Sequence, residues 1–471
     1  MAASDARLLP AASIIAERCT RKYLEGMGRL PTRSDTTPVE AGGVNLIVST
    51  QRLSLNLADV VKLHVAEGPV QRATSAQWGV PVVLIGDRCV GEERCQLFPP
   101  EGIFRGATAW IEKHSQDQGL VRLVVAGDAQ SHVRLGGLTV PLRTDFDAAY
   151  SRGVRTSKLH RLGVWGLIGG REVGRRAGMY LLDDYDPTKR PLVMIHGLGS
   201  SPLIWEKLSN AVWSDATLRQ NYQIWHVVYQ TDAPLLVQRR RVQQYLDAAW
   251  KILDPEGDDP ARSHIVLVGH SLGGVIARML CVDSGPSLWH AAFSAPLDSL
   301  EADASERALM EEIFYFHRYP GVKRAVFIAS PHRGSPSATR WFGRVARALV
   351  GKRNDEVATL LKVARRNEAA IQPELKEAYL KGRINSISTL QASQPVSAAG
   401  QRLVPASDIR FHTIAGSKSP DVASDGVVPV SSAELAGAQS TLVVRSGHNV
   451  HESPEAIAEV IRILVEDSSS D

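Results

Sequence analysis

The segment Gly269–Gly274 reads Gly-His-Ser-Leu-Gly-Gly and directly follows the apolar run Ile265–Val268. A strand that enters such a pattern and leaves it as a helix is typical of a sharp turn that exposes a serine hydroxyl. Glycines at positions 269 and 273 avoid a side-chain collision inside the turn, because glycine has no Cβ. We therefore expect Ser271 to be a nucleophile, and the alternative is a strand-to-helix turn that needs glycine for geometry alone.

A serine hydroxyl needs a base to become a good nucleophile, and the base needs a carboxylate that orients it. After such a turn the chain order is Ser, then Asp or Glu, then His. Asp425 follows an expected strand at 410–415 and a short loop, and it is the predicted acid. Asp421 is the alternative, and an aspartate before a glycine can also simply cap a turn.

His448 is the predicted base, because it comes directly after the last expected strand, at 441–444. His451 is the alternative, three residues further on. The two histidines also form a His-x-x-His pair. Since no further ligand cluster accompanies them, we do not expect a metal site.

The negative oxygen of a tetrahedral intermediate requires backbone N–H groups that already point at it. One donor is expected from Leu272, the residue after the nucleophile. The other is expected from Leu198, in the segment His196–Gly199 that follows the apolar run Pro191–Ile195. We interpret His196 itself as a structural residue that holds this loop in place.

These segments together resemble the bacterial lipase and esterase branch of the α/β-hydrolases. The resemblance covers about residues 175–471 and does not extend to the N-terminal part. It implies hydrolysis of carboxylic esters through an acyl-enzyme, without a cofactor. The segments that carry it are 196–199, 269–273, 425–430 and 448, supported by Ser200–Pro202 with Trp205 and by Ser330–Ser335, which is similar to a segment that borders the active site in that branch.

The same residues would serve a thioesterase, an amidase or an acyltransferase, because a Ser-His-Asp triad acts on the acyl carbon and tolerates several leaving groups. A binding protein that kept the fold and lost catalysis is a further alternative. The expected partner is a small-molecule ester or lipid, and neither the acyl-chain length nor the oligomeric state follows from the sequence.

The pattern from about residue 175 onward alternates apolar strands with helices, which predicts a mostly parallel sheet covered on both faces. We assign residues 161–471 to an α/β-hydrolase domain on this basis. Residues 1–160 contain a short helical start and several strand-like runs punctuated by Gly and Pro, which predicts a smaller, separate β-rich domain of unknown role.

Two insertions, 281–320 and 336–408, are expected to form a helical cap over the site. Helical spacing of apolar residues occurs at 341–350, with arginines between them, and again at 357–364. One interpretation is a fixed cap that shapes the acyl pocket. The other is a lid that opens on contact with a lipid interface.

The 54 basic and 50 acidic residues leave a formal charge of +4, which is too small to indicate nucleic-acid binding. The run Arg239–Arg241 is interpreted as the solvated face of a helix. No apolar stretch is long enough for a membrane helix, and the first 30 residues lack the order of a secretory signal. Localisation stays open between a cytoplasmic protein and an exported one without its leader. The spacing of Cys89 and Cys95 fits either a disulfide or two free thiols.

Overall fold

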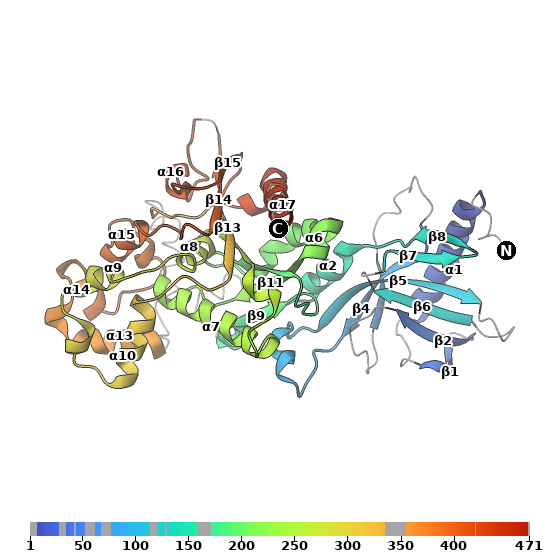
Figure 1. The fold of residues 1–471 in the computed structure, drawn as a ribbon, viewed down its shortest axis with the longest axis horizontal. Helices are drawn as coiled ribbons and strands as arrows, with labels where there is room; N and C mark the ends of the chain where they lie inside the picture. The colour runs from blue at the N-terminus through green and yellow to red at the C-terminus, as the bar shows by residue number, and fades with distance from the viewer. Residues whose placement is uncertain are drawn as a thin grey trace. The chain divides into compact units, whose positions relative to one another are not determined.

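The computed structural model describes residues 7–27, 34–41, 44–51, 62–66, 77–113, 121–127, 130–157, 171–334, 355–419 and 421–469. The contacts within the chain divide it into two compact units, Met1–Ser157 and Lys158–Asp471 (Figure 1). Among the described residues, no helix combines the length and apolar character that a membrane span requires.

The N-terminal unit contains a six-stranded sheet in the order β1-β2-β6-β5-β4-β3. The strands bury Val82 and Leu123 together with Leu24 of the N-terminal helix, which confirms the expected β-rich region. Cys89 and Cys95, whose pairing the spacing left open, are joined in a disulfide. The elements are α1 (Leu9–Met27), β1 (Ser34–Ala41), β2 (Val44–Gln51), β3 (Lys62–Val65), β4 (Val80–Gly86), β5 (Ile103–Lys113), β6 (Val121–Gly127), β7 (His132–Leu135), β8 (Leu138–Pro141) and α2 (Phe146–Thr156).

The second unit contains a seven-stranded sheet in the order β15-β14-β13-β12-β10-β11-β9. Every neighbouring pair is parallel except β11 and β9, which confirms the predicted sheet. Its inner strands are continuous apolar runs because both of their faces are covered. The strands are β9 (Gly178–Leu181), β10 (Arg190–Ile195), β11 (Tyr222–Val228), β12 (Ile265–His270), β13 (Val322–Ile328), β14 (Arg410–Ser417) and β15 (Ser440–Arg445).

Helices pack on both faces of this sheet. On one face, Leu192 and Met194 of β10 share an apolar cluster with Leu208 and Val460 from two of the covering helices. On the other face, α8 lies against β12 and β13. The first face is covered by α5 (Glu206–Ser214), α6 (Ala216–Asn221) and α17 (Pro454–Ser468), and the second by α7 (Leu235–Leu253) and α8 (Leu272–Met279).

The parallel strands bring several loops to one edge. Since β10, β12, β13, β14 and β15 run in the same direction, the residues that follow them meet at the carboxyl end of the sheet. Ligands of open parallel sheets bind at this edge. The fold therefore gathers the candidate residues of the sequence, although they are far apart along the chain.

The helices between the later strands, which we call the cap helices, share one apolar core with α7 and α8. Trp289, Phe293, Met310, Leu360 and Tyr379 belong to one buried cluster, so both insertions pack together. The helical set at 357–364 is buried in this cluster, whereas the set at 341–350 lies outside the described residues. The cap helices, which gather at one end of Figure 1, are α9 (Ser287–Ala292), α10 (Ala304–Phe314), α13 (Asp355–Arg366), α14 (Pro373–Leu380) and α15 (Pro395–Gln401).

The interpretation of Arg239–Arg241 as a solvated helix face is wrong. Arg239 is 2% exposed, and its guanidinium lies 3.9 Å from the centre of the Phe316 ring. Arg241 is also buried and donates from Nε to the Glu356 carboxylate at 2.7 Å. The run instead anchors the cap to α7 through a partner on α13.

Candidate active site

Ser271 occupies the turn between β12 and α8 with φ 54° and ψ −121°. Residues other than glycine rarely adopt a positive φ, and such strain concentrates at functional sites. The backbone N–H of Ser271 donates to the carbonyl of Ile328 on the neighbouring strand at 2.9 Å, which fixes the turn. The turn therefore holds the hydroxyl at the carboxyl end of the sheet.

The glycines around Ser271 are required by close backbone contacts. A Cβ at Gly269 would lie 2.5 Å from the carbonyl oxygen of Gly273. A Cβ at Gly273 would collide with the carbonyl of Ile195, and one at Gly274 with the Ser330 hydroxyl. The expectation that positions 269 and 273 need glycine is confirmed.

The structure brings His448 to Ser271 and Asp425. Nε2 of His448 lies 3.0 Å from Oγ of Ser271, and Nδ1 lies 2.7 Å from Oδ2 of Asp425. An ionised carboxylate only accepts hydrogen bonds, so Nδ1–H donates to Asp425 and Nε2 is left to accept from the hydroxyl. This tautomer is the one that a general base for Ser271 requires.

The carboxylate of Asp425 is held on its other side by the backbone. Its Oδ1 accepts from the N–H groups of Val427 at 2.8 Å and Val428 at 2.7 Å, and the residue is 1% exposed. Asp425 thus caps a turn with one oxygen and contacts His448 with the other. Asp421 is exposed.

His451 packs among aromatic rings and does not contact Ser271. Its ring centre lies 4.2 Å from that of His270 and 5.8 Å from that of Trp205. Burial, followed by the nearby His448 and Lys207, lowers the pKa of His451 to about 3, so the imidazole is neutral. Of the two histidines that the sequence offered, His448 is the one that the fold places beside the hydroxyl.

The two expected oxyanion donors are available to a ligand. The backbone N–H groups of Leu198 and Leu272 have no acceptor within the described part of the chain. A Cβ at Gly197 would lie 3.1 Å from Cβ of Ser271, so the Leu198 loop runs beside Ser271. Unpaired amides next to a serine hydroxyl are suited to bind a developing negative charge.

His196 begins this loop, and the hydrogen bonds of its ring and carbonyl go to Gly197 and Tyr229, not to Ser271. Its ring stacks on Tyr229 with centres 4.5 Å apart, and the Tyr229 hydroxyl donates to the His196 carbonyl at 2.6 Å. Burial lowers the pKa of His196 to about 4. These contacts agree with the interpretation of His196 as a residue that holds the loop.

Sequence reasoning missed His270, the residue before Ser271. Its Nε2 lies 2.9 Å from the backbone carbonyl of His448, and its ring centre lies 5.0 Å from that of His448. Burial, followed by the neighbouring His451 and His448, lowers the pKa of His270 well below its usual value. The Gly-His-Ser motif contains His270, but the residue that it contacts, His448, lies 178 residues later, so the motif alone could not show this contact.

One acidic group in the described residues has the geometry of a metal site. Asp254, Asp258 and Asp259 bring carboxylate oxygens within 4.8 Å of one another. They precede β12, whereas Ser271 follows it, so the group lies at the opposite end of that strand. Oδ1 of Asp254 accepts three backbone N–H groups of its own turn, which accounts for the cluster without an ion.

A family model described as "Alpha/beta hydrolase family" matches residues 192–460. No curated protein matches the chain.

Three solved structures illustrate the similarity. The mature lipase BlEst2 of Bacillus licheniformis is 16% identical, with 61% of this chain and 97% of that chain covered and a TM-score of 0.35. A putative aryl esterase from Burkholderia cenocepacia is 17% identical, with 62% and 96% covered and a TM-score of 0.30. Esterase B from Lactobacillus rhamnosis is 16% identical, with 61% and 78% covered and a TM-score of 0.31.

Proposed function

The chain belongs to the alpha/beta hydrolase family, and we propose that it is a serine carboxylic ester hydrolase in which Ser271, His448 and Asp425 are the catalytic residues. One observation carries the proposal: an unbroken series of contacts runs from the Asp425 carboxylate through the His448 ring to the Ser271 hydroxyl. A hydroxyl, an imidazole and a carboxylate in this order are the groups that acyl transfer requires.

The reaction follows from the positions of these groups. His448 takes the proton of the Ser271 hydroxyl as its oxygen attacks the ester carbonyl, and the N–H groups of Leu198 and Leu272 bind the resulting oxyanion. His448 then gives that proton to the leaving alcohol, which departs and leaves an acyl group on Ser271. A water molecule, deprotonated by His448, attacks the acyl-enzyme and releases the acid, and the proton returns to Ser271.

The surroundings of these groups strengthen the interactions between them. Ser271 is 4% exposed and Asp425 is 1% exposed, so little water screens the charge that develops on His448. Asp425 stabilises that imidazolium without needing to take its proton. Chemistry of this kind requires no metal ion or cofactor.

The proposal is tested by replacing Ser271 with alanine and measuring hydrolysis of a short nitrophenyl ester. We expect kcat to fall by about 10⁴-fold or more, with an unchanged circular dichroism spectrum. Ser330→Ala is the matched control, because Ser330 is a buried serine beside the turn whose hydroxyl bonds to the Ile328 carbonyl. The proposal fails if Ser271→Ala retains the activity of this control.

The leaving group is tested separately, because the same residues could cleave a thioester or an amide. The proposal predicts the highest kcat/KM for the ester among an ester, a thioester and an amide with the same acyl chain. A higher kcat/KM for the thioester or the amide would leave the assignment of the catalytic residues standing and would change the proposed class of substrate.

A further inference from the structure

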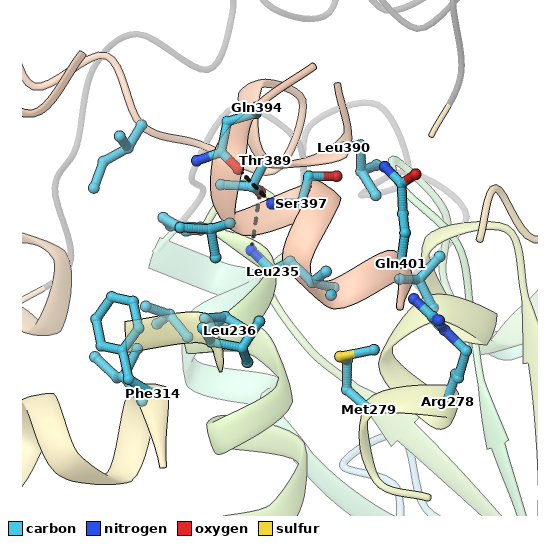
Figure 2. Close-up of a pocket in the computed structure, with 18 of the residues that line it drawn as sticks. Leu235, Leu236, Arg278, Met279, Phe314, Thr389, Leu390, Gln394, Ser397 and Gln401 are labelled. Atoms are coloured by element: carbon cyan, nitrogen blue, oxygen red, sulfur yellow. Dashed lines mark hydrogen bonds between the residues drawn. The ribbon is translucent and has the colours of Figure 1, made fainter. Parts of the chain in front are cut away.

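A pocket lies between α8 and the cap, and its lining does not include Ser271 or His448 (Figure 2). Part of its wall is apolar and comes from several cap helices and α7. The empty space between its atoms is about 700 Å³, open solvent at the mouth included. The apolar residues include Leu235, Leu236, Leu288, Phe314 and Leu360.

Another part of the lining carries polar side chains. Arg278 of α8 and His332 after β13 contribute to it together with Gln394, Ser397 and Gln401 of the α15 segment. In Figure 2 the Arg278 side chain rises from α8 toward Gln401. The pocket therefore has one hydrocarbon-like wall and one wall with a cationic group.

Arg278 is a buried cation without a counter-ion in the described residues. It is 2% exposed, its Nη1 donates to the backbone carbonyl of Leu403 at 2.9 Å, and its Nε has no partner there. The residues 335–354, which the structure does not describe, contain no Asp or Glu. By contrast, the equally buried Arg324 pairs with Asp467 at 2.7 Å. A buried charge is costly unless it is paired, so the position of Arg278 calls for an anionic partner.

His332 adds an unused hydrogen-bond donor. It is 1% exposed, and neither ring nitrogen has a partner in the described part of the chain. Burial, followed by the charge of Arg278, lowers the pKa of His332 well below its usual value, so the ring is neutral and one nitrogen carries a proton. Burial lowers the pKa of Arg278 only to about 10, so the guanidinium stays charged at neutral pH.

The polar wall lies at a definite distance from the nucleophile. Arg278 lies in the last turn of α8, seven residues after Ser271 at the start of that helix, which corresponds to about 10 Å along the helix axis. Val275, one turn after Ser271, also lines the pocket. A chain of several methylene groups can span this distance.

We propose that the pocket binds a carboxylate carried on an apolar chain, with Arg278 as its counter-ion and His332 as a hydrogen-bond donor. The cap supplies the apolar wall for the chain, and the guanidinium presents the planar donor set that suits a carboxylate. Two sources share this chemistry: a free fatty acid, including one released by hydrolysis, and an ester whose acyl chain ends in a carboxylate. The binding site itself does not depend on the proposed function.

The test is calorimetric titration of Ser271→Ala protein with octanoate, 1-octanol and octylamine. We expect octanoate to bind about tenfold or more tightly than 1-octanol, since a hydrogen bond to a charged group supplies that difference, and octylamine not to bind. Arg278→Met should remove this preference. Arg462→Met is the control for net charge, because Arg462 is half exposed on α17 and does not line the pocket.

The proposal is overturned if 1-octanol binds Ser271→Ala protein as tightly as octanoate does, or if folded Arg278→Met keeps the preference. The comparison of octanoate with 1-octanol uses Ser271→Ala protein, which retains Arg278. It therefore still tests the proposal if Arg278→Met does not fold. Absence of ester hydrolysis in the wild type would contradict the proposed function and leave the binding result standing.

Turnover by the wild type distinguishes the two sources once octanoate binding is established. A higher kcat/KM for the nitrophenyl monoester of suberic acid than for nitrophenyl octanoate assigns the site to a carboxylate-terminated acyl chain. A lower value, with competitive inhibition by octanoate, assigns it to the free fatty acid.

Discussion

Nε2 of His270 lies 2.9 Å from the backbone carbonyl oxygen of His448. The contact joins the residue before the proposed nucleophile to the residue proposed as its base. A carbonyl only accepts, so Nε2 of His270 must carry the proton and donate it. Because burial lowers the pKa of His270, the ring is neutral and this single N–H positions the loop of His448.

Removing this donor should slow the reaction without weakening substrate binding. We expect His270→Leu to lower kcat by about 10- to 100-fold with little change in KM, because a small displacement of His448 disrupts its alignment with Ser271. His270→Gln should restore part of the rate, since its amide can donate from a similar position. Steady-state kinetics of both variants at one pH provide the measurement. An unchanged kcat in His270→Leu would show that the contact has no positioning role.

Buried neutral histidines should make the hydrolase unit sensitive to mild acid. Burial lowers the pKa to about 4 for His196 and to about 3 for His226, whereas the unfolded chain titrates near 6.5. Between these values the unfolded state binds more protons, so stability falls as the pH drops from about 6.5 to about 4. Each such histidine contributes a slope of up to about 1.4 kcal/mol per pH unit. Urea unfolding followed at several pH values measures the slope.

A pair of variants assigns that slope to individual residues. His226→Gln should lower the slope of the unfolding free energy against pH by about 1.4 kcal/mol per pH unit, the contribution of one proton, because the amide does not titrate in this range. His317→Gln is the control, because the His317 side chain is 95% exposed. An unchanged slope in His226→Gln, or an equal reduction in the control, would contradict the assignment. The slope is best compared between about pH 6.5 and 5, because a carboxylate whose pKa is lowered by its partners, such as Asp467, loses its contribution only below about pH 5.

Asp467 should be critical for stability although it lies near the end of the chain. Its carboxylate accepts from Arg324 at 2.7 Å and pairs with Arg190 at 3.1 Å, and both arginines are buried. Asp467→Ala leaves these charges uncompensated, so we expect a loss of about 3–5 kcal/mol in the free energy of unfolding.

The matched control is Asp408→Ala, since Asp408 is half exposed and pairs with Arg318 at 3.2 Å near the surface. Its loss should be about 1 kcal/mol or less. Urea unfolding at neutral pH compares the two variants. Equal losses of unfolding free energy in Asp467→Ala and Asp408→Ala would show that the buried ion pairs of Asp467 stabilise the protein no more than an exposed ion pair does.

Much of the sheet could be predicted from the sequence because its strands are buried on both faces. Such strands are continuous apolar runs, and the runs at 191–195, 265–268 and 410–415 lie within β10, β12 and β14. Chain order then pointed to Asp425 and His448, which the fold brings to Ser271. These features are local or follow from strand direction, so no distant contact had to be known.

Most features that escaped prediction depend on segments that are distant along the chain. Arg241 is buried because Glu356 arrives from a helix 115 residues later. The contact of His270 joins segments that meet only after the sheet has formed. Arg278 follows Ser271 by seven residues, but this spacing cannot show that no carboxylate of the described residues approaches its guanidinium. The pairing of Cys89 with Cys95 likewise needed the fold.

Activation of Ser271 by His448 can be tested by labelling with a fluorophosphonate probe. We expect the wild type to form one covalent adduct, which peptide mapping places on Ser271. Ser271→Ala should not react, and His448→Ala should react far more slowly while remaining folded. A wild type that stays unlabelled, an adduct on a different serine, or undiminished labelling of His448→Ala would contradict the account.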